Sequence, residues 1–149
     1  VLPGTPMVGR MLIQPEVEDA DGVRRKLDDV LGPWFSIVGW RVDPQAALSA
    51  PDRAFWQALG ARFVCVDRAR GTAVPGERRV SAHGTVHVED IDNHFEDWMA
   101  AHPGGAVLVL RPDRYIAAQC SAEQLTDVTR RFGDFTVTPV ATDLQKKAA

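Results

Sequence analysis

Two cysteines, Cys65 and Cys120, are the first side chains in this sequence that could do chemistry. A redox-active pair is usually spaced Cys-x-x-Cys at the N-terminal end of a helix, where the helix lowers the pKa of the attacking thiol. These two cysteines are far apart in the sequence, and each lies inside an apolar run. We therefore expect both thiols to be buried, reduced and poorly reactive, with no disulfide between them.

A pair of histidines could instead hold a metal ion. On an extended strand His83 and His87 would share a face, and Glu89, Asp90 or Asp92 could add oxygen ligands for zinc or iron. The spacing is loose, however, and the alternation of polar and apolar residues around these histidines indicates a solvated strand face. We predict no metal site, and metal binding by the two histidines is the alternative.

Other catalytic and cofactor motifs are missing from the sequence. No Gly-x-Gly-x-x-Gly follows an apolar strand, and the sequence has neither a P-loop nor a Gly-x-Ser-x-Gly elbow. We therefore predict no catalytic residue, no cofactor-binding residue and no tight binding of FAD or NAD(P)H by this chain.

Charge and hydropathy exclude two classes of partner. The net charge is -3 and no basic stripe is present, so the sequence predicts no nucleic-acid surface. The longest apolar runs, residues 35–40 and 106–110, are far shorter than the about 20 residues of a membrane-spanning helix. The sequence also begins without a secretory signal, so we expect a protein of the reducing cytoplasm.

Short apolar runs and helical periodicities indicate the elements that must position these residues. Four runs have the length and composition of buried strands, and they span residues 35–40, 62–66, 106–110 and 115–119. Three segments read as helices. Residues 51–60 have Pro51 near the first turn and Gly60 at the end, and residues 90–101 and 121–133 have apolar positions at helical spacing. We expect Asp90 or Asp92 to cap the second helix, Ser121 to cap the third, and Gly133 to end it.

The N-terminal part of the sequence permits more than one interpretation. Residues 11–17 could form a strand, and residues 19–22 have turn chemistry. Residues 23–31 have a helical stripe that Gly32 ends, although a strand followed by one helical turn fits nearly as well.

The order of the predicted elements indicates a fold. From residue 35 it runs strand, helix, strand, helix, strand, strand, helix, with residues 80–89 as an added edge strand that has a bulge at Gly84. A helix joins the first two strands, which should therefore be parallel, and the last two strands form a hairpin. This order predicts an α/β, thioredoxin-like fold, a mixed four- to five-stranded sheet with helices on both faces.

Thioredoxins carry their cysteine pair directly after the first strand and a cis-proline before the third. Here residues 41–46 read Arg-Val-Asp-Pro-Gln-Ala, and Gly104 and Gly105 precede the third strand. We therefore expect neither redox nor peroxidase activity.

One polar turn, residues 111–115, has two interpretations. Its arginines could pair with carboxylates inside the domain, or they could dock against another domain, since arginine is favoured at interfaces. The candidate docking residues, which include Met11 and Trp34 outside the turn, are Met11, Trp34, Arg111, Asp113, Arg114 and Tyr115.

Four stretches of the sequence resemble one family, and they are residues 9–15, 27–35, 37–40 and 109–117. The most specific are Leu-Asp-Asp-Val-Leu-Gly at residues 27–32 and Arg-Pro-Asp-Arg-Tyr at residues 111–115. Together the stretches resemble the C-terminal domains of class A FAD-dependent aromatic hydroxylases, in particular the 3-(3-hydroxyphenyl)propionate hydroxylases.

The resemblance implies a larger enzyme around this chain. FAD and substrate domains would precede it, NADH or NADPH would reduce the flavin, and a phenolic compound such as 3-(3-hydroxyphenyl)propionate would be hydroxylated. The family's FAD-binding and substrate residues would lie upstream, so the chain alone is expected to be inactive. It would be a structural or docking domain in a homo-oligomer.

The expected division of the chain follows from the same resemblance. Residues 1–10 are a linker from the catalytic region, residues 11–141 are the thioredoxin-like domain, and residues 142–149 are a frayed tail. The alternative is a stand-alone, degenerate thioredoxin- or peroxiredoxin-like protein.

Overall fold

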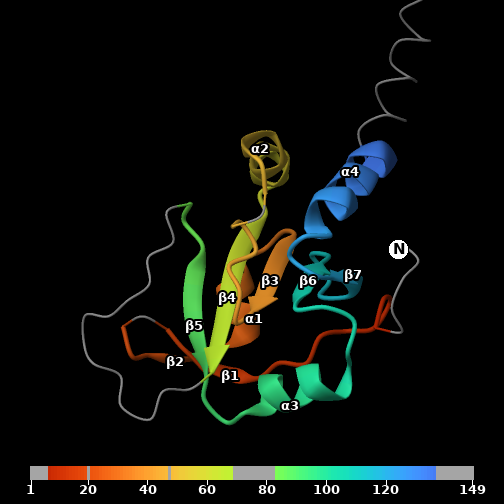
Figure 1. Ribbon diagram of the computed structural model, residues 1–149. Helices are drawn as coiled ribbons and strands as arrows, with labels where there is room; N and C mark the ends of the chain where they lie inside the picture. The colour runs from red at the N-terminus through yellow and green to blue at the C-terminus, as the bar shows by residue number, and fades with distance from the viewer. Residues whose placement is uncertain (1–6, 20, 47, 69–82, 137–149) are drawn as a thin grey trace, which may run out of the picture.

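The computed structural model describes residues 7–19, 21–46, 48–68 and 83–136 (Figure 1). The strands in these residues are β1 (Glu16–Glu18), β2 (Arg24–Lys26), β3 (Ser36–Trp40), β4 (Arg62–Arg68), β5 (Val86–Asp90), β6 (Val107–Leu110) and β7 (Ile116–Cys120). The helices are α1 (Leu27–Leu31), α2 (Ala50–Ala58), α3 (His94–Ala101) and α4 (Leu125–Thr136).

The described strands form one mixed sheet in the order β2-β1-β5-β4-β3-β6-β7. β3, β4 and β5 are parallel neighbours, whereas β6 pairs antiparallel with β3 and with β7. This is the predicted thioredoxin-like arrangement, and the four predicted buried strands are confirmed. The described sheet has seven strands rather than four or five, because β1 and β2 add a short ribbon beside β5.

The sequence predicted a strand at residues 80–89 on the edge of the sheet, and the predicted edge position is wrong. β5 lies between β4 and β1, since Val17 is in register with Asp90 and Glu18 with Glu89. Gly84 adopts a left-handed φ of 83° before the strand begins, so it ends a turn and does not form a bulge within the strand. Residues 80–82 of the predicted strand lie outside the described residues.

The N-terminal elements follow the alternative interpretation. Residues 24–26 form β2, and α1 is a single short helix whose Leu27, Val30 and Leu31 are buried. Residues 23–31 do not form one helix, because residues 24–26 pair with β1 as an exposed strand. Only the apolar residues that follow β2 form the helix that packs on the sheet. Of the predicted strand at residues 11–17, only β1 and one bridge between Met11 and Tyr115 form.

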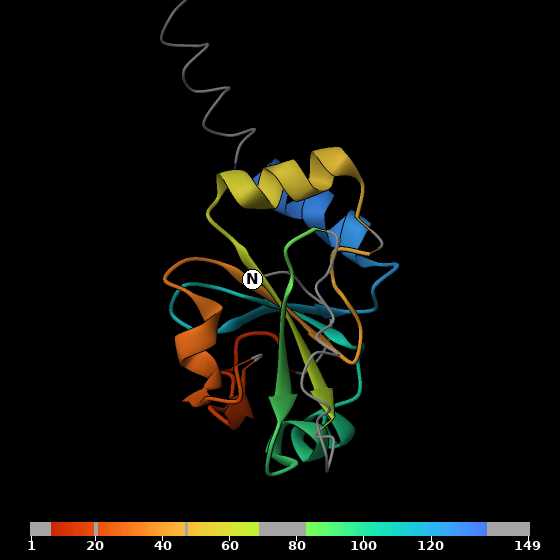
Figure 2. The ribbon, with the colours of Figure 1, turned by 90° about the vertical axis from the view of Figure 1, so that its left-hand side faces the viewer.

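The sheet separates two apolar cores, and each core is covered by its own helices. Leu31, Phe95 and Met99 bring α1 and α3 onto one face, where they meet Val38, Val64 and other strand residues. On the opposite face Trp56 of α2 packs with Leu125 and Phe132 of α4, and its indole donates a 2.8 Å hydrogen bond to Thr129. Figure 2 shows α2 crossing α4, with α3 at the opposite end of the molecule.

The helix ends show which local signals decided their position. Ser121 Oγ accepts from the Gln124 N–H while Gln124 Oε1 accepts from the Ser121 N–H, which is the predicted capping box. The prediction that Gly133 ends α4 is wrong, since the helix continues to Thr136. One glycine in a helix costs only about 1 kcal/mol relative to alanine, so the packing of the helix face outweighs it.

The start of α3 was predicted four residues too early. Asn93, in a left-handed conformation, is the N-cap residue, and its side chain makes no capping hydrogen bond. The predicted capping carboxylate is nevertheless used, because Asp90 Oδ2 accepts a 2.9 Å hydrogen bond from the Glu96 N–H. No helix in the described part of the chain is long and apolar enough to cross a membrane.

Candidate docking site

The end of the sheet after β3 is where thioredoxins carry their cysteines, and here it holds a polar turn. Asp43 Oδ1 accepts from the Gln45 N–H at 2.9 Å and from the Thr85 hydroxyl at 2.6 Å. Gln45 Nε2 donates to Thr85 Oγ1 at 2.9 Å and to the His83 carbonyl at 3.0 Å. These contacts tie residues 41–46 to the segment that precedes β5, so the turn has a structural role.

The two cysteines lie where the sequence placed them. Cys65 lies within β4 and Cys120 at the end of β7, and both are buried and reduced. Burial raises the pKa of the Cys120 thiol to about 12, so very little thiolate forms at neutral pH. Their low reactivity stays a prediction.

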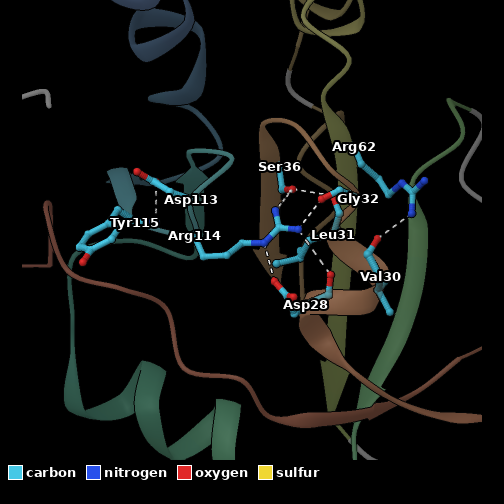
Figure 3. A network of polar contacts seen from close by, with 9 residues as sticks. All are labelled: Asp28, Val30, Leu31, Gly32, Ser36, Arg62, Asp113, Arg114 and Tyr115. Carbon is cyan, nitrogen blue, oxygen red and sulfur yellow. Dashed lines mark hydrogen bonds and ion pairs between the residues drawn. The ribbon is translucent and has the colours of Figure 1, made fainter.

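The opposite end of the sheet is organised around Arg114 (Figure 3). This residue has a left-handed φ of 71° in the turn between β6 and β7, and its side chain points back into the domain. Its Nε donates to Asp28 Oδ1 at 2.5 Å, its Nη1 to Ser36 Oγ at 3.5 Å, and its Nη2 to the carbonyl of Gly32. All three guanidinium nitrogens therefore have acceptors from α1 or the residues just after it.

These contacts cap the C-terminal end of α1, whose last carbonyls have no partner within the helix. The Ser36 hydroxyl donates to the Leu31 carbonyl at 2.6 Å, and Arg62 Nη1 donates to the Val30 carbonyl at 3.0 Å (Figure 3). Positive charge at a helix C-terminus is also favourable because the carbonyl ends of the peptide dipoles are negative. Arg114 thus joins residues 27–32 to residues 111–115, the two most specific stretches of the sequence.

An exposed strip beside this network contains three of the predicted docking residues. Residues 9–12 run along β7, with the Gly9 N–H donating to Ile116 O at 2.8 Å and the Leu12 N–H to Arg114 O at 3.0 Å. Met11 and Tyr115 form a bridge in this pairing, and their side chains are 57% and 38% exposed. The guanidinium carbon of Arg111 lies 5.9 Å from the centre of the Tyr115 ring. We call Met11, Arg111 and Tyr115 the docking strip.

The other predicted docking residues have different environments. Asp113 pairs with Arg111 at 2.6 Å and accepts from the Tyr115 N–H, so it shapes the turn. The Arg114 side chain is only 15% exposed and is occupied by the α1 contacts. Trp34 is 58% exposed and lies against Gly60, and no described contact joins it to the docking strip. It shares the same end of the sheet, because Ser36 is in register with Leu110.

The histidines do not come together as the alternative hypothesis required. His83 lies in the turn before β5, where its carbonyl accepts from Gln45. The His87 side chain instead meets Asp67 on β4, with Nδ1 and Oδ2 3.6 Å apart, and Cys65 is in register with His87. Sequence analysis missed Cys65 and Asp67 because it compared residues along one strand, whereas the neighbours come from the adjacent strand.

Sequence comparisons relate the chain to a known family of domains. The family described as the HcaD C-terminal domain matches residues 9–135. A 3-(3-hydroxy-phenyl)propionate/3-hydroxycinnamic acid hydroxylase of Burkholderia vietnamiensis is 57% identical over 128 residues, which are 86% of this chain and 23% of that protein. The chain therefore spans less than a quarter of the length of this relative.

Comparisons of structure show the fold. A domain of a possible thiol-disulfide isomerase from Cytophaga hutchinsonii has a TM-score of 0.58 and 18% identity, over 91% of this chain and 99% of that one. The thioredoxin domain of a thiol-disulfide oxidoreductase from Bacteroides vulgatus has a TM-score of 0.57 and 13% identity, over 89% and 99% of the two chains. At this identity the likeness shows the thioredoxin-like architecture alone.

Proposed function

Because the chain belongs to the HcaD C-terminal domain family, we propose that it is the docking domain of a longer, FAD- and NAD(P)H-dependent aromatic hydroxylase. The substrate would be a phenolic compound such as 3-(3-hydroxyphenyl)propionate, as the name of its 57% identical relative suggests. The domain would pack on the catalytic part of its own longer chain and support a homo-oligomer in the cytoplasm. Catalytic and FAD-binding residues would lie outside residues 1–149.

The observation that carries the docking role is where the exposed apolar side chains lie. Five large apolar side chains are exposed in the described residues, and they are Met11, Val23, Trp34, Val86 and Tyr115. Two of them lie side by side in the docking strip with Arg111, and Trp34 lies at the same end of the sheet. Aromatic residues, methionine and arginine are the residue types enriched at the centre of interfaces.

The length of the relatives supports the catalytic region as the occupant. A relative in which this domain makes up 23% of the chain has a large remainder that the domain must contact or be tethered to. The docking strip includes Met11, which precedes β1 in the sequence, so a catalytic region on the N-terminal side of the domain would connect close to it.

The test uses the longer hydroxylase that carries this chain. Met11→Ser and Tyr115→Ser together should weaken assembly and lower the melting temperature, because polar side chains would replace apolar interface contacts. Sedimentation and thermal melting measure both effects, and the flavin absorbance should keep its shape because no flavin contact is expected here.

The matched control is Val23→Ser, which changes an exposed apolar side chain beside β2. The control should leave sedimentation and melting unchanged. If the double variant sediments and melts like the parent, the docking strip is ordinary surface and the proposed function is wrong.

A further inference from the structure

We propose that Cys65, Asp67 and His87 form a zinc-binding site on the sheet face shared by β4 and β5. This inference does not depend on the docking role, because the site lies away from the docking strip and would bind its ion in either case. It goes beyond the histidine pair considered from the sequence, since two of its three ligands come from β4.

The sheet register brings the three side chains together. β4 and β5 run parallel with Cys65 opposite His87, and Asp67 follows Cys65 by two residues. Residues two apart on a strand project from the same face, so all three side chains lie on one face of two adjacent strands. Both strands are held by their neighbours in the sheet, which makes the positions of the ligands rigid before any ion binds.

The distances are close to those of a tetrahedral ion. Cys65 Sγ is 3.8 Å from Asp67 Oδ1, and His87 Nδ1 is 3.6 Å from Asp67 Oδ2. The three possible ligand atoms all lie within 4.8 Å of one another. Tetrahedral zinc, with bonds of about 2.0–2.3 Å, needs ligand separations of about 3.3–3.6 Å. Small side-chain rotations would bring the three groups to that spacing.

The site also has a polar atom that the protein leaves unsatisfied. His87 Nδ1 is buried and has no hydrogen-bond partner, because Asp67 lies beyond hydrogen-bond distance. A buried nitrogen without a partner is costly, and a metal bond would satisfy it. Neutral imidazole with its proton on Nε2 presents the lone pair that zinc requires.

The burial of the site leaves a route for the ion. Cys65 is 2% exposed, whereas the side chains of Asp67 and His87 are 19% and 17% exposed. The cluster is therefore open on the carboxylate and imidazole side and closed behind the sulfur. An ion bound here would keep one coordination position for water, as zinc does with three protein ligands.

The donor set decides which ion fits. One thiolate, one imidazole and one carboxylate suit zinc, a borderline ion that takes sulfur, nitrogen and oxygen together. Oxygen-seeking magnesium or calcium would not use the sulfur. On binding, the Cys65 thiol gives its proton to solvent and a Zn–S bond forms, with no change in oxidation state.

The experiment measures zinc binding by the 149-residue chain, prepared without a histidine tag, reduced and treated with a chelator. Calorimetric titration with zinc chloride should show one ion per chain at micromolar or tighter dissociation constant. Zinc should also raise the melting temperature, because it binds the folded state. Cobalt(II) in place of zinc should produce a thiolate-to-cobalt charge-transfer band.

Two variants and two controls separate this site from chance binding. Cys65→Ser and His87→Gln should each weaken zinc binding at least about tenfold. Cys120→Ser, the other buried cysteine, and His94→Gln, an exposed histidine, should bind zinc as the parent does.

The outcomes decide the proposal even if a variant is unstable. The parent and the Cys120→Ser variant must both show the cobalt–thiolate band, which then comes from Cys65 alone. Absence of stoichiometric zinc binding by the parent overturns the proposal, and so does full affinity in folded His87→Gln. Loss of the band in Cys120→Ser would place the thiolate on the wrong strand and also overturn it.

Discussion

Two polar clusters, one around Arg114 and one around β5, differ in how completely their groups are hydrogen bonded. Each guanidinium nitrogen of Arg114 has an acceptor, and those acceptors belong to α1 or to residues just after it. Around β5, in contrast, three buried polar atoms of the described residues have no hydrogen bond, and they are Gln45 Oε1, His87 Nδ1 and Asp90 Oδ1. The first cluster is closed within the domain, and the second is incomplete.

The difference distinguishes a structural network from a candidate ligand site. A buried polar group stabilises a fold when its partners are all present, so a complete network needs nothing from outside. An incomplete cluster costs stability unless a ligand, ion or water completes it.

The largest expected effect concerns the Cys120 thiol, which serves as the reference for Cys65. Its pKa rises from 9.0 to about 12, a difference of about 3, because burial disfavours the thiolate. In a Cys65→Ser chain, labelling of native Cys120 should therefore be two to three orders of magnitude slower than in urea-unfolded chain. A disulfide reagent followed by absorbance measures both rates, and equal rates would show that the thiol is accessible.

Removing the centre of the closed network should destabilise the domain. Arg114→Met keeps an unbranched apolar stem but leaves Asp28 and the Gly32 carbonyl without their donor. We expect a loss of about 2 kcal/mol in the free energy of unfolding, measured by urea denaturation. Arg111→Met, which removes an exposed pair with Asp113, should change it by less than about 0.5 kcal/mol. Similar losses for both variants would contradict the network.

The turn after β3 offers a test of the cluster around β5, because Gln45 in this turn belongs to that cluster. A Cβ on Gly39 would lie 2.1 Å from the Val42 carbonyl oxygen, which is backbone and must move. Gly39→Ala should cost about 2 kcal/mol, because the turn at residues 41–46 would be displaced. Gly133→Ala in α4 is the matched control. A Cβ there would meet only Phe55 of α2, at 3.9 Å. Gly133→Ala should raise the free energy of unfolding by about 0.5–1 kcal/mol. If Gly39→Ala also raised it, the predicted clash at residue 39 would be refuted.

The smallest effect belongs to an exposed carboxylate–arginine pair outside both clusters. Hydrogen bonding from Arg25, and then from the Val23 N–H, lowers the pKa of Asp19 below its usual 3.8. A lowered carboxylate pKa adds stability above pH 3.8 that is lost as the pH falls through the folded-state value. Asp19→Asn should therefore melt slightly below the parent at pH 7, with a difference that shrinks in salt and vanishes in acid. A pH-independent difference would indicate lost packing.

Local signals in the sequence determined most of the fold. Short apolar runs predicted β3, β4, β6 and β7, and the predicted Ser121 capping box forms, although α4 itself begins at Leu125. Pro51 and Gly60 correctly bracketed α2, which begins at Ala50 and is followed by a left-handed glycine. Four sequence stretches indicated a family of aromatic hydroxylase domains, which the match over residues 9–135 confirms.

The sequence misjudged elements that depend on partners far along the chain. The position of β5 inside the sheet depends on pairing with β1, which is only three residues long. The passage of α4 through Gly133 depends on packing against α2, because the local glycine signal is weaker than the buried helix face.

The sites were decided by tertiary structure for the same reason. Sequence alone left the residue 111–115 turn open between internal pairing and docking, and only the fold showed Arg114 reaching 86 residues back to Asp28 while Arg111 and Tyr115 stay outside. Likewise, His87 meets Cys65 and Asp67 through the register of two parallel strands. Residue type and spacing state what a side chain can do, but hydrogen bonds and metal sites need atoms within a few ångströms. For residues on different elements, that proximity is set by how the elements pack.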